Sequence, residues 1–170
     1  MKILIVRHAS AAERDATAWP DDRDRPLTPE GIRRFRRMAG HLGRNEPSAR
    51  RPEVVWSSPL RRAWQTAEIL QTESGWPAPR SLAALEPDAD PSAVLAFLRE
   101  DQEHEIVALV GHRPGLHRLL SLLLSGSADG VRLELRKGGA ALVHMEGEVR
   151  PGGGRLEWLL SPRLVPGVQD

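Results

Sequence analysis

Cysteine is absent from the 170 residues of the sequence, which excludes disulfides, thiolate nucleophiles and Cys-ligated metal sites. Long apolar runs are also missing, because none approaches the ~20 residues that a membrane-spanning helix requires. The apolar stretch at the N-terminus, Ile3-Leu4-Ile5-Val6, is too short for the core of a signal peptide. We therefore expect a cytoplasmic protein without membrane contact, in which residues 1–170 form a single domain.

Neither sign of charge predominates, because the sequence has 24 basic and 23 acidic residues. The balance, with no basic run interleaved with aromatics, argues against a nucleic-acid partner. All but two of the basic residues are arginines, the better bidentate ligands for phosphate. The sequence also lacks an EF-hand, a His-Glu-x-x-His motif and a glycine-lysine phosphate loop. None of its motifs calls for a metal or another cofactor, and we expect none.

The apolar pattern predicts an α/β fold. Continuous runs typical of central parallel strands occur at 3–6, 54–56 and 106–110. Helical spacing follows from Pro29, from Pro59, over 94–98 and from Pro114. Two later strands are predicted as an antiparallel hairpin, at 139–146 and 155–160. This order indicates a three-layer α/β/α sandwich with a mostly parallel central sheet and an antiparallel C-terminal part.

Three of the predicted parallel strands end in polar residues, at Arg7-His8, Ser57-Ser58 and Gly111-His112. In open α/β sheets, ligands bind outside the carboxyl ends of such strands. Ser58-Pro59 and Pro114 also begin helices, whose N-terminal amides carry partial positive charge. The shared edge of the sheet is therefore predicted to bind an anion, and phosphate is the obvious candidate.

Together, four segments resemble the histidine phosphatase superfamily, whose fold is phosphoglycerate mutase-like. They are Arg7-His8-Ala9, residues 25–31 (RPLTPEG), residues 58–66 (SPLRRAWQT) and residues 110–112 (VGH). Within that superfamily, the short chain and its Arg-Pro-Leu-Thr segment are most similar to SixA-type phosphohistidine phosphatases. The resemblance implies that His8 is the nucleophile and passes the phosphoryl group to water. It also implies that Arg7, Arg62 and His112 hold the phosphate oxygens.

The resemblance suggests further residues, each with an alternative. Arg62 fits the motif, whereas Arg61 would point roughly 100° elsewhere on the helix. Ser58 is expected to donate another hydrogen bond to the phosphate, or only to cap its helix. Arg25 is expected at the rim of the site, or is an ordinary loop arginine. Glu86 lies where larger members carry the acid that protonates the leaving group, or is one of several solvated loop acids.

The chemistry of phosphoryl transfer agrees with these roles. The reaction needs mainly positioning and charge neutralisation, which two guanidinium groups and an imidazole supply without Mg²⁺. A neutral imidazole attacks through one nitrogen only while the other keeps its proton. We therefore expect a backbone carbonyl or a similar acceptor to hold the second ring nitrogen of His8.

The sequence thus predicts a metal-independent phosphatase that forms a phosphohistidine on the enzyme. The preferred substrate is phosphohistidine on a protein of the His-containing phosphotransfer type, because the brief stretch 71–91 leaves the pocket open. A phosphatase for a small phosphate ester, such as a sugar or nucleotide derivative, is the nearest alternative. A third is a module that binds phosphoprotein without turnover, although the pair His8 and Arg62 argues against it.

Overall fold

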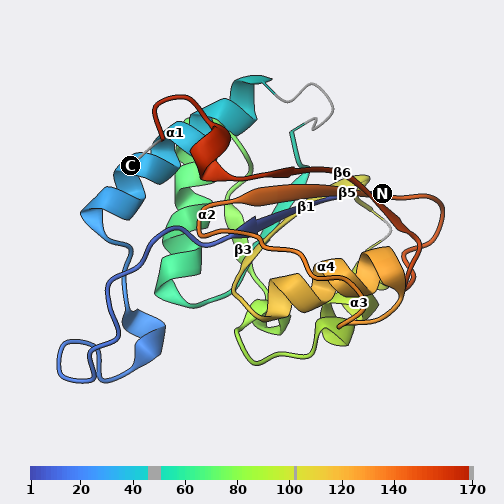
Figure 1. The fold of residues 1–170 in the computed structure, drawn as a ribbon, viewed down its shortest axis with the longest axis horizontal. Coiled ribbons are helices and arrows are strands. Elements are labelled where there is room, and N and C mark those ends of the chain that lie inside the picture. Colours follow the sequence, from blue (N-terminus) through green and yellow to red (C-terminus); the bar gives the residue numbers. More distant parts are fainter. Residues whose placement is uncertain (46–50, 102, 169–170) are drawn as a thin grey trace.

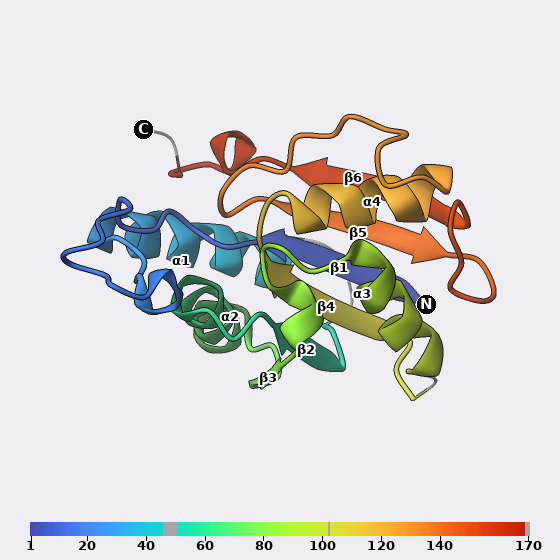
Figure 2. The ribbon, with the colours of Figure 1, turned by 90° about the horizontal axis from the view of Figure 1, so that it is seen from below.

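The computed structural model describes residues 1–45, 51–101 and 103–168, and this part of the chain forms a three-layer α/β/α sandwich (Figure 1). Its six-stranded sheet has the order β3-β2-β4-β1-β5-β6 (Figure 2). The parallel strands are β1 (Lys2–Arg7), β2 (Val54–Ser57), β3 (Pro79–Ser81) and β4 (Ile106–Gly111). The antiparallel strands are β5 (Ala140–Met145) and β6 (Gly154–Leu160). The predicted fold class, with its antiparallel C-terminal part, is confirmed.

Two helices cover each face of the sheet. One face is covered by α1 (Pro29–Asn45) and α2 (Arg61–Ser74), and the other by α3 (Pro91–Glu100) and α4 (Gly115–Ser125). The apolar run of β1 is continuous because both faces of the strand are buried. Leu4 and Val6 pack in the core under α1 and α2, and Ile3 and Ile5 pack in the core under α3 and α4. None of the helices in the described ranges is long and apolar enough to cross a membrane.

Two local predictions differ from the structure. Helices α2 and α4 begin at Arg61 and Gly115, after the prolines at which the sequence places their starts. In the first case the chain stays extended through Leu60, whose N–H donates to the Ser58 hydroxyl. The short strand β3 was not predicted, because three residues are too few to show an alternating pattern.

The register of the sheet brings the predicted site segments together. Arg7 is paired with Gly111, and Ser57 with Val110. The pairing of β1 with β4 continues one residue beyond β1, because the His8 N–H donates to the Gly111 carbonyl at 3.0 Å. The carboxyl ends of β1, β2 and β4 therefore meet at one edge, as expected for a parallel sheet.

Candidate active site

His8 follows β1 and is only 7% exposed. Its Nδ1 lies 2.7 Å from the Ala9 carbonyl oxygen, which can only accept, so Nδ1 carries the proton and Nε2 keeps a lone pair. The expected acceptor is thus the next peptide group along the chain. Thr66 fixes that peptide, because its hydroxyl accepts from the Ala9 N–H at 3.1 Å and donates to the Arg62 carbonyl at 2.7 Å.

His112 follows β4 and lies against His8, with 4.9 Å between the ring centroids. Burial lowers the pKa of His8 to about 3, and the charges of Arg62 and Arg7 add to this effect while the Ala9 hydrogen bond opposes it. Burial, together with the neighbouring His8 and Arg62, lowers the pKa of His112 to about 2. Both rings are therefore neutral near pH 7, and His8 is in the state that a nucleophile requires.

Three buried N–H groups of the site have no hydrogen-bond partner in the described structure: Arg7 Nε, Arg62 Nε and His112 Nδ1. Each belongs to a residue for which the sequence predicts phosphate contacts. A buried donor without a partner costs ~1–3 kcal/mol unless water or a ligand satisfies it. Ring nitrogens of Trp56, His117 and Trp158 are also buried without a partner in the described structure, but they do not lie on residues with predicted phosphate contacts. An oxyanion beside His8 is a candidate partner for the three N–H groups of the site.

Arg62 is fixed by Asp22, a residue that the sequence analysis missed. Asp22 lies in the 3₁₀ turn η1 (Asp22–Asp24), and its carbonyl accepts from Arg62 Nη1 at 2.8 Å. Its carboxylate Oδ2 lies 3.1 Å from Arg62 Nη2. Burial lowers the pKa of Arg62, and the Asp22 charge opposes that shift. Asp22 thus holds the two terminal nitrogens and leaves the Nε side of the guanidinium for a ligand.

Arg25 acts on the same loop. Its Nε donates to Asp22 Oδ1 at 2.7 Å, and its Nη1 donates to the Ala12 carbonyl at 2.7 Å. Its nearest link to the site therefore runs through Asp22. Arg61, by contrast, is exposed and reaches only the Asp24 carbonyl, at 3.4 Å. The helix thus turns Arg62 inward and Arg61 outward, as the motif predicts.

Ser58 contacts His112 and also its own turn. Its hydroxyl lies 2.9 Å from His112 Nε2 and accepts from the Leu60 N–H at 3.3 Å. A hydroxyl that accepts from Leu60 still has its own proton to donate to Nε2. This arrangement places the proton of the neutral His112 ring on Nδ1, the nitrogen without a partner. The geometry shows Ser58 orienting His112.

Arg7 is held by the segment that precedes β5. Its Nη1 donates to the Leu135 carbonyl at 3.0 Å. The Leu135 N–H in turn donates to His117 Nε2 at 3.0 Å. Burial lowers the pKa of both Arg7 and His117. His117 therefore has a structural role, because it supports the segment that holds Arg7.

Glu86 lies beside the site and is engaged with Arg23. Its two carboxylate oxygens accept from Arg23 Nη1 at 2.7 Å and Nη2 at 3.3 Å. Within the described ranges, its carboxylate makes no hydrogen bond or ion pair with His8, Arg62 or His112. The ion pair ties the loop that carries Asp22 to the segment after β3.

Known proteins resemble this chain in sequence. A family model described as the histidine phosphatase superfamily, branch 1, matches residues 3–86. An uncharacterized protein of Picosynechococcus is 35% identical over 141 residues, covering 82% of both chains. An uncharacterized protein of Mycobacterium tuberculosis is 30% identical over 168 residues, covering 93% of this chain and all of that protein.

Among solved structures, the protein histidine phosphatase SixA complexed with tungstate is 28% identical, with a TM-score of 0.80, and the alignment covers 95% of this chain and 97% of that one. The putative alpha-ribazole-5'-P phosphatase of Escherichia coli has a TM-score of 0.74 at 16% identity, with 95% of this chain and 98% of that one covered. The second likeness shows the shared fold alone.

Proposed function

Because the chain belongs to the histidine phosphatase superfamily, we propose that it is a phosphatase that forms a phosphohistidine on His8 and that its substrate is phosphohistidine on a protein. One observation carries the proposal. The charges of Arg7 and Arg62 act on His8 and the His112 ring lies against it, each of these three residues has a buried N–H without a partner, and His8 Nε2 keeps its lone pair.

In the first step, Nε2 of His8 forms a bond to phosphorus while the bond between phosphorus and the substrate nitrogen breaks. The electron pair of that bond returns to the substrate imidazole, which takes a proton from water. Positive charge develops on the His8 ring, and the hydrogen bond from Nδ1 to the Ala9 carbonyl strengthens with it. The guanidinium groups of Arg7 and Arg62 neutralise the phosphoryl oxygens in line with the general requirements of phosphoryl transfer.

In the second step, water attacks phosphorus and the bond to His8 Nε2 breaks. The electron pair returns to the imidazole, and the protons of water pass to phosphate and solvent. His8 is again neutral, which its lowered pKa favours. The N–H of His112 Nδ1 donates to an oxygen of the phosphoryl group in both steps.

The state of Glu86 supports phosphohistidine as the substrate. Its carboxylate is held by Arg23, so the leaving group finds no free acid there. A departing imidazole is readily protonated by solvent near neutral pH, whereas a departing alkoxide is strongly basic and gains much from a positioned acid. The likeness to SixA, a protein histidine phosphatase by its printed description, points the same way.

Rapid-quench experiments test the proposal. A phosphohistidine peptide should give an acid-labile, base-stable phosphoenzyme that disappears in His8→Ala and persists in the matched control His144→Ala, at a histidine on β5. Phosphohistidine peptide, a sugar phosphate and an aryl phosphate are then compared at equal concentration. Undiminished phosphoenzyme in His8→Ala contradicts the mechanism, and a clear preference for the sugar phosphate contradicts the substrate.

A further inference from the structure

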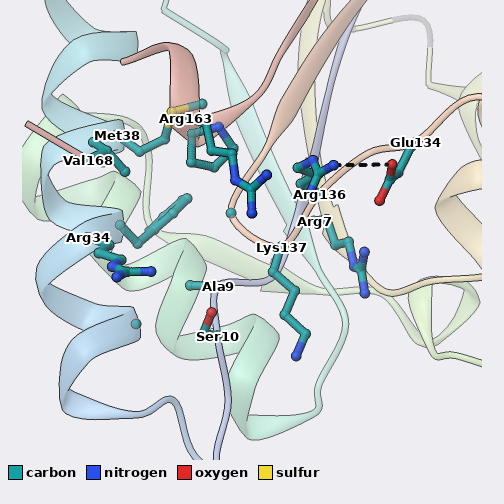
Figure 3. A pocket seen from close by; sticks show the side chains of 14 residues that line it. Arg7, Ala9, Ser10, Arg34, Met38, Glu134, Arg136, Lys137, Arg163 and Val168 are labelled. Atoms are coloured by element: carbon teal, nitrogen blue, oxygen red, sulfur yellow. Dashed lines mark ion pairs between the residues drawn. The ribbon is translucent and has the colours of Figure 1, made fainter. Parts of the chain in front are cut away.

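A second cavity adjoins the active site at Arg7 (Figure 3). It has a volume of about 340 Å³ and lies between α1, the turn before β5 and the 3₁₀ turn η3 (Pro162–Leu164). Ala9 and Ser10, which directly follow the nucleophile, form part of its wall. The cavity therefore shares Arg7 with the active site and borders the two residues that follow His8. We name it the side groove.

The base of the side groove is built from core residues. Phe35 and Met38 of α1 and Val168 near the C-terminal end line it, and each of them is buried. Because these three side chains are packed within the core, they cannot move to fill the groove without disturbing that packing. The side groove is therefore a preformed hollow.

Its rim is strongly basic. The lining residues include five cations, Arg7, Arg34, Arg136, Lys137 and Arg163, against one acid, Glu134. Figure 3 shows Arg136 turned toward Glu134, whereas Arg34 and Arg163 project over the hollow. Within the described ranges, no ion pair or hydrogen bond is found for the exposed side chains of Lys137 and Arg163. Lys137 and Arg163 thus offer positive charge that the described part of the chain does not neutralise, whereas Arg34 donates from Nε to Glu30 Oε1 at 2.8 Å.

The distribution of these cations favours an extended anionic chain over one small anion. The donors of the active site are buried, whereas Lys137 and Arg163 line the hollow from two separate segments with exposed side chains. Along α1, the groove runs from Gly31 to Met38, a rise of ~10 Å. That length equals about three residues of extended peptide.

We propose that the side groove binds an acidic segment of the phosphoprotein substrate, adjacent to its phosphohistidine. The inference rests on the proposed function and names the kind of partner it acts on. Carboxylates on that segment pair with Arg163 and Lys137 while the phosphoryl group reaches His8. Exposed charges of this kind steer association and select the partner, and salt screens them.

The probes are two synthetic phosphohistidine peptides of one length, with three residues on each side of the histidine. These flanking residues are Asp and Glu in the acidic peptide and Asn and Gln in the neutral one. We expect kcat/KM to be about tenfold higher for the acidic peptide at low salt, the combined effect of a few exposed ion pairs. The preference should vanish near ~1 M salt, where the Debye length is ~3 Å.

The decisive variant is Arg163→Glu, with Arg118→Glu on α4 as a control of equal charge change on the other face of the sheet. Arg163→Glu should abolish the preference for the acidic peptide, mainly through KM, and leave hydrolysis of an aryl phosphate within twofold. Arg118→Glu should change neither. Fluorescence anisotropy of a labelled, unphosphorylated acidic peptide gives a readout without turnover, and only Arg163→Glu should weaken its binding.

Equal kcat/KM for the two peptides, or equal effects of the two charge reversals, overturns the inference. A higher kcat/KM for a sugar bisphosphate than for the acidic peptide, if Arg163→Glu removes that difference, also overturns the inference. The side groove would then bind a small anion. These failures differ from failure of the proposed function, in which neither peptide leaves a phosphoryl group on His8.

Discussion

At the scale of single residues, Arg61 and Arg62 are neighbours with opposite environments. Arg62 is buried and its Nε has no hydrogen-bond partner in the described structure, whereas Arg61 is exposed. We expect Arg62→Ala to lose ~3–4 kcal/mol of transition-state stabilisation, the usual effect of removing one preorganised donor. Arg62→Lys should recover little, because an ammonium group cannot replace the planar fork. The measurement is kcat/KM on an aryl phosphate.

Arg61→Ala is the matched control and should stay within twofold of the wild-type protein. Thermal unfolding of each variant separates lost chemistry from lost folding. If Arg61→Ala were the more damaging change, the assigned orientation of α2 would be wrong.

Asp22 extends this argument to a residue that positions Arg62. Asp22→Asn removes the charge that holds Nη2 and keeps the backbone carbonyl that holds Nη1. We expect kcat to fall about tenfold, equivalent to ~1.4 kcal/mol, with a smaller change in KM, because the guanidinium remains but is less firmly oriented. Asp24→Asn on the same turn is the control. A change in KM alone would assign Asp22 to substrate binding.

At the scale of elements, the Arg23–Glu86 ion pair joins the turn η1 to the segment after β3. If phosphohistidine is the substrate, Glu86→Gln should lower its hydrolysis less than tenfold, because its imidazole leaves without a strong acid. Residual hydrolysis of a sugar phosphate should fall much further only if Glu86 leaves Arg23 to protonate the departing alkoxide, since a general acid is worth ~10²–10⁴-fold for such esters. Steady-state rates on both substrates decide, with Asp88→Asn as the control.

A large defect of Glu86→Gln on the phosphohistidine peptide would count against that substrate. It would instead favour the small phosphate ester, for which Glu86 would have to leave Arg23 and reach the leaving group.

The same elements show what a sequence can predict. Strand β1 was predictable because a strand buried on both faces needs four consecutive apolar residues, Ile3 to Val6. The carboxyl-end rule for parallel sheets then brought His8, Ser58 and His112 together. The contact of Asp22 with Arg62 was not predictable, because the two lie 40 residues apart and η1 has neither periodicity nor a motif. The same holds for the pairing of Arg23 with Glu86.

At the scale of the whole molecule, the neutral histidines make stability depend on pH. Unfolding exposes His8 and His112, whose pKa values then return from about 3 and about 2 toward the ordinary 6.5. As the pH falls below 6.5, the unfolded chain binds protons that the folded protein excludes. Stability should therefore be full above pH 6.5 and decline toward pH 3, by up to ~1.4 kcal/mol per pH unit for each histidine.

Urea unfolding at pH 7.5 and pH 5.5 measures this decline. His112→Asn should lose less stability between the two pH values than the wild-type protein, whatever its stability at pH 7.5. An equal loss in both proteins would mean that other groups cause the acid sensitivity.

The unpartnered N–H groups at the sheet edge also affect folding itself. If an oxyanion completes the three unsatisfied buried donors, as the proposed function requires, phosphate, vanadate or tungstate should act as a ligand of the folded state. At a hundredfold excess over Kd, such binding adds ~2.7 kcal/mol of stability, or a rise in Tm of roughly 5–10 °C for a chain of this size. Thermal unfolding with vanadate and with chloride should show the rise in the wild-type protein and its loss in Arg62→Ala. The choice of buffer then sets both the measured Tm and the fraction of free enzyme, because an anion that protects the fold also blocks His8.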